Sequence, residues 1–445
     1  MRGSSSPISV STKLQQIAEL ARQSPSMVLT TLAHHIDVGF LQEAYRRTRK
    51  DGAPGVDRQT ANQYAEELDS NLCSLLDRLK SGTYQAPPVK RVHIPKGDGS
   101  KTRPIGIPTF EDKILQRAVT MVLEAVYEQE FHECSYGFRP GRSAHQALQA
   151  LWRALTEMGG GWVYEVDIKG FFDSLVPEHL RSFLDQRVRD GVLRRSIDKW
   201  LKAGVMEDGA VSFPDFGTPQ GGVVSPLLAN VYLHEVLDKW FEKQVRPRLA
   251  GRAVLIRYAD DFVIAFSRES DARRVMGVMP KRFGRYGLTL HPEKTRLVRF
   301  HRPSSSGGYQ RGSRPGTFDL LGFTHYWGRS YRGFPVIKCR TVKGRLSRAL
   351  VAVALWCRTH RHLPVGEQQR ILNLKLRGHY SYYGITGNFR ALKRFASGAK
   401  ATWRKWLNCR SQRARMNWER FTRLLKRYPL LPPRVVQSVY AQRTR

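Results

Sequence analysis

The chain has 445 residues, with 74 Lys and Arg against 38 Asp and Glu, so its net charge is +36. This length predicts about two to four structural units, and an apolar content of 41% is ample for packed cores. Most apolar runs are far shorter than the ~20 residues that a membrane span needs. No apolar core of a signal peptide follows Met1, which predicts a cytoplasmic protein. The five cysteines form no C-x-x-C pair, so neither a disulfide framework nor a zinc ribbon is indicated.

The N-terminal part of the chain predicts helices and one hairpin. Apolar residues recur at helical spacing from Lys13 to Arg49, which indicates two helices before the turn-forming residues 51–57. Residues 87–108 alternate apolar and basic side chains around a Gly-Asp-Gly turn, a pattern typical of a β-hairpin. Residues 109–130 predict a helix with two acidic residues in its first turn.

The central part predicts the sheet of an α+β core. Residues 161–167 form an apolar strand pattern that ends on an acid, a helix follows Pro177, and residues 257–266 predict two paired strands. Residues 301–316 are rich in Ser and Gly and predict a linker.

The C-terminal part predicts helices on a strongly basic surface. Residues 331–445 hold 27 Lys and Arg against two Glu, a net charge of +25, and Trp and Tyr residues are interleaved with them. This pattern favours a nucleic-acid-binding surface, while a histone-like or membrane-surface role stays open. Beyond Arg340 the helical pattern is interrupted at Gly378, Gly384, Gly387 and Pro432-Pro433.

Two adjacent acids, Asp260 and Asp261, stand between strand-forming residues and are expected at the tip of a hairpin. Buried neighbouring carboxylates repel each other, and a bound divalent cation, usually Mg²⁺ in phosphate chemistry, compensates for that repulsion. Phosphoryl transfer with two metals needs carboxylates from separate strands, and Asp167 ends a second apolar strand. For the dipeptide alone, an ordinary surface turn is the alternative.

These blocks resemble reverse transcriptases. Tyr258-Ala259-Asp260-Asp261 is similar to the palm motif of that family, and residues 167–173 are similar to its first metal-binding block. Residues 217–230, between them, resemble the loop and helix that contact the incoming nucleotide and the template. A Gly-rich turn before a helix would explain the last block locally, but not the three blocks in this order.

Further blocks are similar to those of bacterial group II intron-encoded reverse transcriptases, and the resemblance runs from about Ala33 to the C-terminus. The last of the blocks resembles their maturase segment, domain X. The blocks span residues 103–108, 136–145, 291–295, 320–324 and 376–385.

The resemblance implies a right-hand polymerase of the α+β class. Residues 1–30 would be an N-terminal extension, 31–160 the rest of the extension and the fingers, 161–335 the palm, and 336–445 an all-helical thumb and maturase domain with a basic nucleic-acid-binding region. The implied activity is RNA-directed DNA synthesis with two Mg²⁺ ions and deoxynucleoside triphosphates. The implied partners are a group II intron RNA, whose splicing the protein assists, and a DNA target that primes copying during intron mobility at the nucleoid.

The resemblance also implies roles for single residues. Asp167, Asp260 and Asp261 would be catalytic, and together with Ile168 they would hold the metals. Nucleotide binding would fall to Lys101, Arg103, Ile168, Phe172 and Gln220, with Phe172 excluding a 2′-hydroxyl. Primer support would fall to Lys294, Leu321, Gly322 and Phe323, and RNA binding to Arg377, His379, Tyr380, Tyr382 and Tyr383. Three alternatives stay open: Phe172 as a core aromatic, Lys294 as a solvated cation, and the tyrosines as packing between thumb helices.

Many members of this group continue into a Cys- and His-containing HNH endonuclease, whereas this sequence shows no such segment before Arg445. The expectation is therefore that the protein does not cut the second target strand. Two other functions stay open. One is a splicing factor with a vestigial polymerase, and the other is a domesticated reverse transcriptase that serves DNA repair or antiphage defence.

Overall fold

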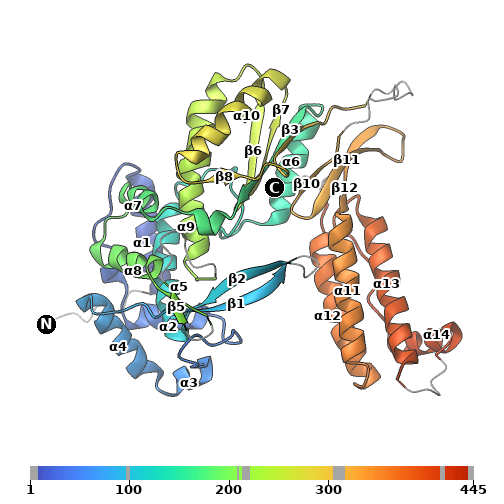
Figure 1. Ribbon diagram of the computed structural model, residues 1–445, viewed down its shortest axis with the longest axis horizontal. Helices are drawn as coiled ribbons and strands as arrows, with labels where there is room; N and C mark the ends of the chain where they lie inside the picture. Colours follow the sequence, from blue (N-terminus) through green and yellow to red (C-terminus); the bar gives the residue numbers. More distant parts are fainter. Residues whose placement is uncertain are drawn as a thin grey trace.

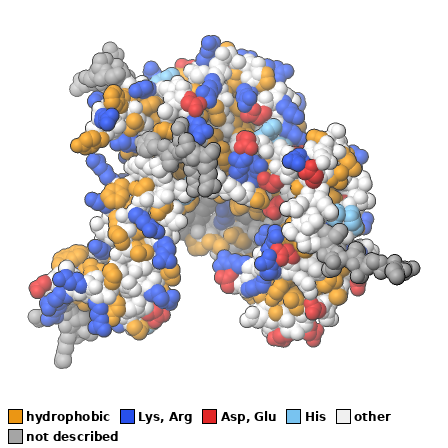
Figure 2. Space-filling view, turned by 180° about the vertical axis from the view of Figure 1, so that it is seen from behind, with side chains coloured by type: hydrophobic (Ala, Val, Ile, Leu, Met, Phe, Trp, Pro, Cys, Tyr) orange, Lys and Arg blue, Asp and Glu red, His pale blue; other side chains and the backbone are white. Residues whose placement is uncertain are grey.

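The computed structural model describes residues 9–96, 101–207, 210–212, 221–303, 316–410 and 416–438. A sheet-containing body carries two separate lobes, one formed by the N-terminal helices and one by the C-terminal helices (Figure 1). Seen from behind, the molecule is hollowed between these two lobes, and Lys and Arg side chains occur along both (Figure 2). The α+β right-hand arrangement expected from the sequence is confirmed.

The first lobe begins with helices whose N-termini are capped by side chains. Ser9, Asp37, Thr60 and Thr109 each accept a hydrogen bond from a backbone N–H of the first turn that follows, which satisfies a donor that the helix itself leaves free. The helices predicted before residue 51 and after residue 109 are confirmed. The helices are α1 (Val10–Gln23), α2 (Val38–Arg47), α3 (Ala61–Glu66), α4 (Leu68–Ser81) and α5 (Phe110–Tyr127), with a short 3-10 turn, η1 (Ala33–His35).

The predicted hairpin of residues 87–108 is confirmed as β1 (Val89–Lys96) and β2 (Lys101–Ile107), which pair antiparallel. Its predicted Gly-Asp-Gly turn lies outside the described residues. Two short strands, β4 (Val205–Glu207) and β5 (Ala210–Ser212), extend the sheet in the order β2-β1-β4-β5. The hairpin projects from the first lobe (Figure 1).

The body is built on the sheet that the sequence predicted. Strand β3 lies between β7 and β9 and also pairs with β8, and β6 pairs with β7 at the edge. Buried residues of β7 follow one another without alternation, as expected for a strand covered on both faces. The elements are α6 (Ala144–Glu157), β3 (Trp162–Lys169), β6 (Ala253–Tyr258), β7 (Asp261–Phe266), α10 (Glu269–Gly284), β8 (Thr289–Leu290) and β9 (Arg296–Arg299).

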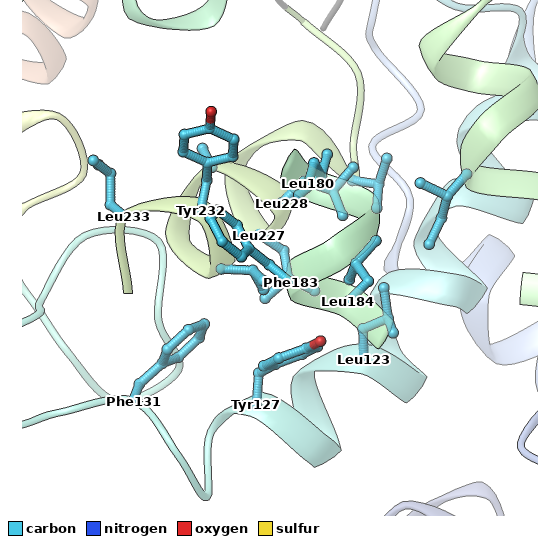
Figure 3. Packing of buried hydrophobic residues seen from close by; sticks show 14 of the residues in the cluster. Leu123, Tyr127, Phe131, Leu180, Phe183, Leu184, Leu227, Leu228, Tyr232 and Leu233 are labelled. Atoms are coloured by element: carbon cyan, nitrogen blue, oxygen red, sulfur yellow. The ribbon is translucent and has the colours of Figure 1, made fainter. Parts of the chain in front are cut away.

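Helices between β3 and β6 join the body to the first lobe. Leucine and aromatic side chains of α5, α7 and α9 meet in one apolar contact region (Figure 3). Helix α9 continues into two π-helical segments, whose wider turns change which residues share a face. These elements are η2 (Phe171–Ser174), α7 (Pro177–Asp185), α8 (Gly191–Leu201), α9 (Ser225–Leu233), η3 (His234–Asp238), η4 (Phe241–Val245) and η5 (Arg246–Arg248).

The second lobe starts from a small sheet. Strand β12 reaches Thr341, so the thumb helices begin at Lys343, a few residues after the predicted boundary. Most of the linker predicted over residues 301–316 lies outside the described residues. The elements are β10 (Phe318–Leu320), β11 (Phe323–Arg329), β12 (Pro335–Thr341), α11 (Lys343–Thr359), α12 (Val365–Tyr383), α13 (Phe389–Asn408) and α14 (Trp418–Arg427).

The interruption predicted at Gly378 is wrong, because α12 runs through this residue and ends before Gly384. A glycine costs about 1 kcal/mol in a helix. Burial of Leu372, Leu376 and Tyr380 along one face of the helix outweighs that cost.

Apolar side chains form three buried clusters in the described residues: one between the first lobe and the body, one behind the palm sheet, and one among the thumb helices. All five cysteines are free thiols, three of them buried and two exposed. No described helix combines the length and the apolar composition needed to cross a membrane.

Candidate active site

The register of the palm sheet brings the three predicted catalytic carboxylates together. Strands β6 and β7 are joined by a two-residue turn, Ala259-Asp260, and Asp261 opens β7. Asp261 lies directly opposite Asp167 of β3, so the two side chains project from the same face of the sheet. Ala259 has a φ of +56°, a left-handed conformation that is strained for a residue with a side chain.

Burial and mutual repulsion both raise pKa values among these acids. The carboxyl of Asp261 keeps contact with water, but protein surrounds it on its other sides. Desolvation, and then the negative charges of Asp260 and Asp167, raise the pKa of Asp261 to about 7. Desolvation also raises the pKa of Asp260, although the guanidinium of Arg103 opposes that shift. A cation near these oxygens would relieve the repulsion.

The carboxylate of Asp167 is paired with Lys294, whose Nζ lies 2.8 Å from Asp167 Oδ2. Both side chains are about half exposed, so the pair can open without leaving a charge buried. With Asp167 paired in this way, the described residues contain no group of three His, Cys, Asp or Glu side chains close enough together to hold a metal ion. The donor set nevertheless fits Mg²⁺, which prefers carboxylate oxygens, once Asp167 is released from Lys294.

The buried guanidinium of Arg257 supports the Ala259-Asp260 turn. Arg257 is fully buried and binds both carboxylate oxygens of Asp238, with distances of 2.8 and 2.5 Å. It also donates to Asn230 Oδ1 at 2.9 Å and to the carbonyl of Ala259 at 3.1 Å. Asn230 and Asp238 reach the same guanidinium across the start of the π-helical segment η3. A charge buried this deeply requires all of these partners, so the network fixes the turn.

Gly137 holds the same turn from the other side. A Cβ at Gly137 would lie 2.3 Å from the backbone nitrogen of Ala259 and 2.9 Å from the carbonyl carbon of Tyr258. The carbonyl of Gly137 accepts a hydrogen bond from Asn230 at 2.7 Å. The block of residues 136–145 therefore packs its backbone against the carboxylate turn, a role that the sequence alone did not reveal.

The structure describes the positions of only some of the predicted nucleotide-binding side chains. Arg103 of β2 is close enough to Asp260 to affect its pKa. Lys101 lies at the start of β2, where its side chain is not described, and Gln220 lies outside the described residues. Phe172 is partly buried with its ring 5.4 Å from that of Phe171, which fits either a core role or a contact with the sugar. The side chain of Ile168 is buried, which leaves its backbone as the possible metal contact.

The predicted primer-support turn also adjoins the carboxylates. Leu321 and Gly322 connect β10 and β11, both with positive φ, and Phe323 is fully buried. The backbone N–H of Leu321 lowers the pKa of Asp261 by hydrogen bonding to its carboxylate.

Among the five predicted RNA-binding residues, only Arg377 is exposed. Tyr380 is 2% exposed, and its hydroxyl donates to the carbonyl of Leu431. The His379 ring stacks on Phe395 at 3.7 Å, and burial lowers its pKa to about 4. Tyr382 and Tyr383 are partly buried around Phe323. Packing between thumb and palm accounts for most of this segment.

Residues 94–325 match the reverse transcriptase (RNA-dependent DNA polymerase) family. The match covers more than half of the chain, and the protein belongs to this family.

Individual relatives point to the same branch as the sequence blocks. The chain is 29% identical to the group II intron-encoded protein LtrA of Lactococcus lactis, over 86% of this chain and 75% of LtrA. It is 35% identical to the protein YkfC of Escherichia coli, over 65% of this chain and 84% of YkfC. It is also 29% identical to nuclear intron maturase 2 of Arabidopsis thaliana, over 31% of this chain and 24% of that protein. The resemblance stated from the sequence blocks is confirmed.

Proposed function

We propose that this reverse transcriptase copies RNA by a two-metal mechanism in which Asp167, Asp260 and Asp261 hold the ions. The observation that carries the proposal is the register of β3 and β7, which sets Asp167 opposite Asp261 beside the strained turn. Bound Mg²⁺ ions would activate the primer 3′-hydroxyl and neutralise the charge that develops on the leaving pyrophosphate. The backbone carbonyl of Ile168 would be an additional ligand.

The remaining roles fall to the residues around this turn. Arg103, which already compensates the charge of Asp260, would contact the triphosphate together with Lys101. Lys294 would exchange its partner Asp167 for the primer end when metal binds, and the Leu321–Gly322 turn would support the primer strand. Extension of a DNA primer on an RNA template by the purified protein in Mg²⁺ tests this proposal. A splicing factor with a vestigial polymerase would yield no product.

Phe172→Ala tests nucleotide selection. Because the ring would collide with a 2′-hydroxyl, its loss should raise ribonucleotide incorporation relative to deoxynucleotide incorporation by about tenfold or more. Single-nucleotide extension with each triphosphate measures the two kcat/KM values. Phe171→Leu is a matched control in the neighbouring, fully packed ring. Unchanged discrimination in Phe172→Ala would make Phe172 a core residue only.

We further propose that the protein binds a group II intron RNA, assists its splicing and copies it from a primer supplied by a DNA target. The relatives with intron names support this, as does the basic thumb. A cavity of about 620 Å³ lies between α6, α12 and the C-terminal segment, with Arg377 and Arg434 on its wall. Neither arginine has an ion pair with a described carboxylate, so both are available to phosphate.

Neutralising these two arginines tests the RNA-binding surface. Arg377→Gln with Arg434→Gln should weaken intron RNA binding and reduce its salt slope by about 1.5, because each lost phosphate contact contributes roughly 0.7 to 0.9. The control carries the same charge change on the exposed helix α10, Arg273→Gln with Arg274→Gln, and should bind as wild type. An equal loss for intron RNA and for an unrelated structured RNA would show a non-specific electrostatic anchor.

A further inference from the structure

The Leu321–Gly322 turn touches the carboxylate site on one side and the thumb on the other. Its residues have φ values of +52° and +80°. For Leu321 this left-handed conformation is strained, and it persists only where surrounding contacts fix it. The second turn residue is a glycine, which adopts such a conformation without cost.

The carbonyl of Leu321 accepts a hydrogen bond of 2.8 Å from the hydroxyl of Tyr382. Its N–H faces Asp261 closely enough to lower the pKa of that carboxyl. One residue thus connects the C-terminal end of α12 with a candidate metal ligand. The carbonyl of Gly322 is held by the thumb as well, because it accepts from the N–H of Val342 at 3.0 Å.

The position of Tyr382 is itself fixed from two directions. Its ring stacks on the buried Phe323, with centroids 5.8 Å apart and an interplanar angle of 25°. Its carbonyl accepts a hydrogen bond of 2.8 Å from Nε2 of His145, at the start of the palm helix α6. The hydroxyl therefore points to the turn from a rigid support, and its hydrogen-bonding capacity is used there.

We propose that Tyr382 is a positioning residue of the polymerase reaction, whose hydroxyl fixes the Leu321–Gly322 turn and thereby the carboxylate of Asp261. The inference rests on the proposed role of Asp261 as a metal ligand. The thumb then helps to build the active site, because a shift of α12 would move Leu321 through the Tyr382 hydrogen bond and so change the backbone that faces Asp261.

Tyr382→Phe removes the hydroxyl and keeps the ring stack. At saturating template-primer and nucleotide, we expect kcat to fall about fivefold, the worth of one hydrogen bond, and the Mg²⁺ concentration for half-maximal rate to rise. The affinity for intron RNA without a primer should stay within about twofold of wild type, because the Tyr382 hydroxyl is used on Leu321 and the turn that it fixes is the proposed support of the primer.

Tyr232→Phe is the matched control. Its hydroxyl also donates to a backbone carbonyl, that of Tyr286 at 2.6 Å, but on the palm helices away from the turn. Both variants should lose similar thermal stability, while only Tyr382→Phe should lose kcat and need more Mg²⁺.

Two results would overturn the inference. One is a kcat and Mg²⁺ dependence of Tyr382→Phe equal to those of Tyr232→Phe. The other is weaker RNA binding by Tyr382→Phe at unchanged kcat, which would make Tyr382 an RNA contact. Asp261→Asn in the same assay separates this inference from the proposed function: if that variant stays active, the metal-ligand role of Asp261 itself fails.

Discussion

Replacing Asp260 or Asp261 by Asn is expected to abolish primer extension on RNA with Mg²⁺, with a loss on the order of a thousandfold or more. Asn keeps the size and shape of the side chain, but it replaces one of the two oxygen ligands by an NH₂ group and removes the negative charge that attracts the cation. RNA affinity should stay nearly unchanged, because the basic thumb surface is separate from the palm turn. Residual extension above about one per cent by the double Asn variant would exclude these acids as the metal ligands.

The variant Asp261→Asn should be more stable than the wild-type protein when metal is absent. The pKa of Asp261 is about 7 in the fold, above the ~3.9 of an unfolded chain. The folded state therefore holds the proton more tightly, so the stability that protonated Asp261 contributes is lost as the pH rises from about 4 to about 7. The Tm advantage of Asp261→Asn should be largest above pH 7 and should disappear as the pH falls towards 4. Thermal melting in a chelating buffer across this range measures it.

Gly137→Ala should be the most damaging change outside the carboxylates. The new methyl group would lie 2.3 Å from the backbone nitrogen of Ala259, and backbone atoms cannot rotate away as a side-chain tip can. The turn must shift, and a shift of about 1 Å in a catalytic constellation costs on the order of a hundredfold in rate. We expect that loss in kcat, with RNA affinity retained.

Gly277→Ala is the control for this substitution. It lies in helix α10 with nothing within 4 Å of the added Cβ, so it should keep full activity and gain up to about 1 kcal/mol of stability. Wild-type kcat in Gly137→Ala would show that the close approach of residue 137 does not hold the turn.

Local pattern was sufficient to predict many of the elements. The acidic residues in the first turn of α5, the alternation in the β1–β2 hairpin and Asp167 near the end of β3 are all signals within a few residues of the element they define. The hairpin that carries Asp260 and Asp261 was predicted from the strand-forming residues on either side of them. These features depend on neighbours in sequence, which a single chain displays.

The supports of the turn depend on contacts between distant residues. The side chain of Arg257 binds Asn230 and Asp238. These two residues lie on the same side of their helix because of a π-helical segment, which residue propensities do not predict. Gly137 lies more than 120 residues before the turn that it touches. A glycine within a motif block was the one available signal.

The tyrosines of α12 show a second limit. Interleaved aromatic and basic residues favoured an RNA surface, but Tyr380 is buried and Tyr382 uses its hydroxyl on Leu321. Composition indicates which partners a surface suits, but it does not tell which side of an amphipathic helix each ring occupies. The RNA-binding proposal consequently rests on the exposed arginines.

The most direct test of the central claim is the number of Mn²⁺ ions bound at the palm carboxylates, measured by electron paramagnetic resonance in the presence of template-primer and a non-reactive nucleotide. Mn²⁺ substitutes for Mg²⁺ at sites of oxygen ligands. The account predicts two ions per wild-type protein and fewer in the variant with Asn at both 260 and 261, with nucleic-acid binding retained. An unchanged number of bound ions in that variant would contradict it.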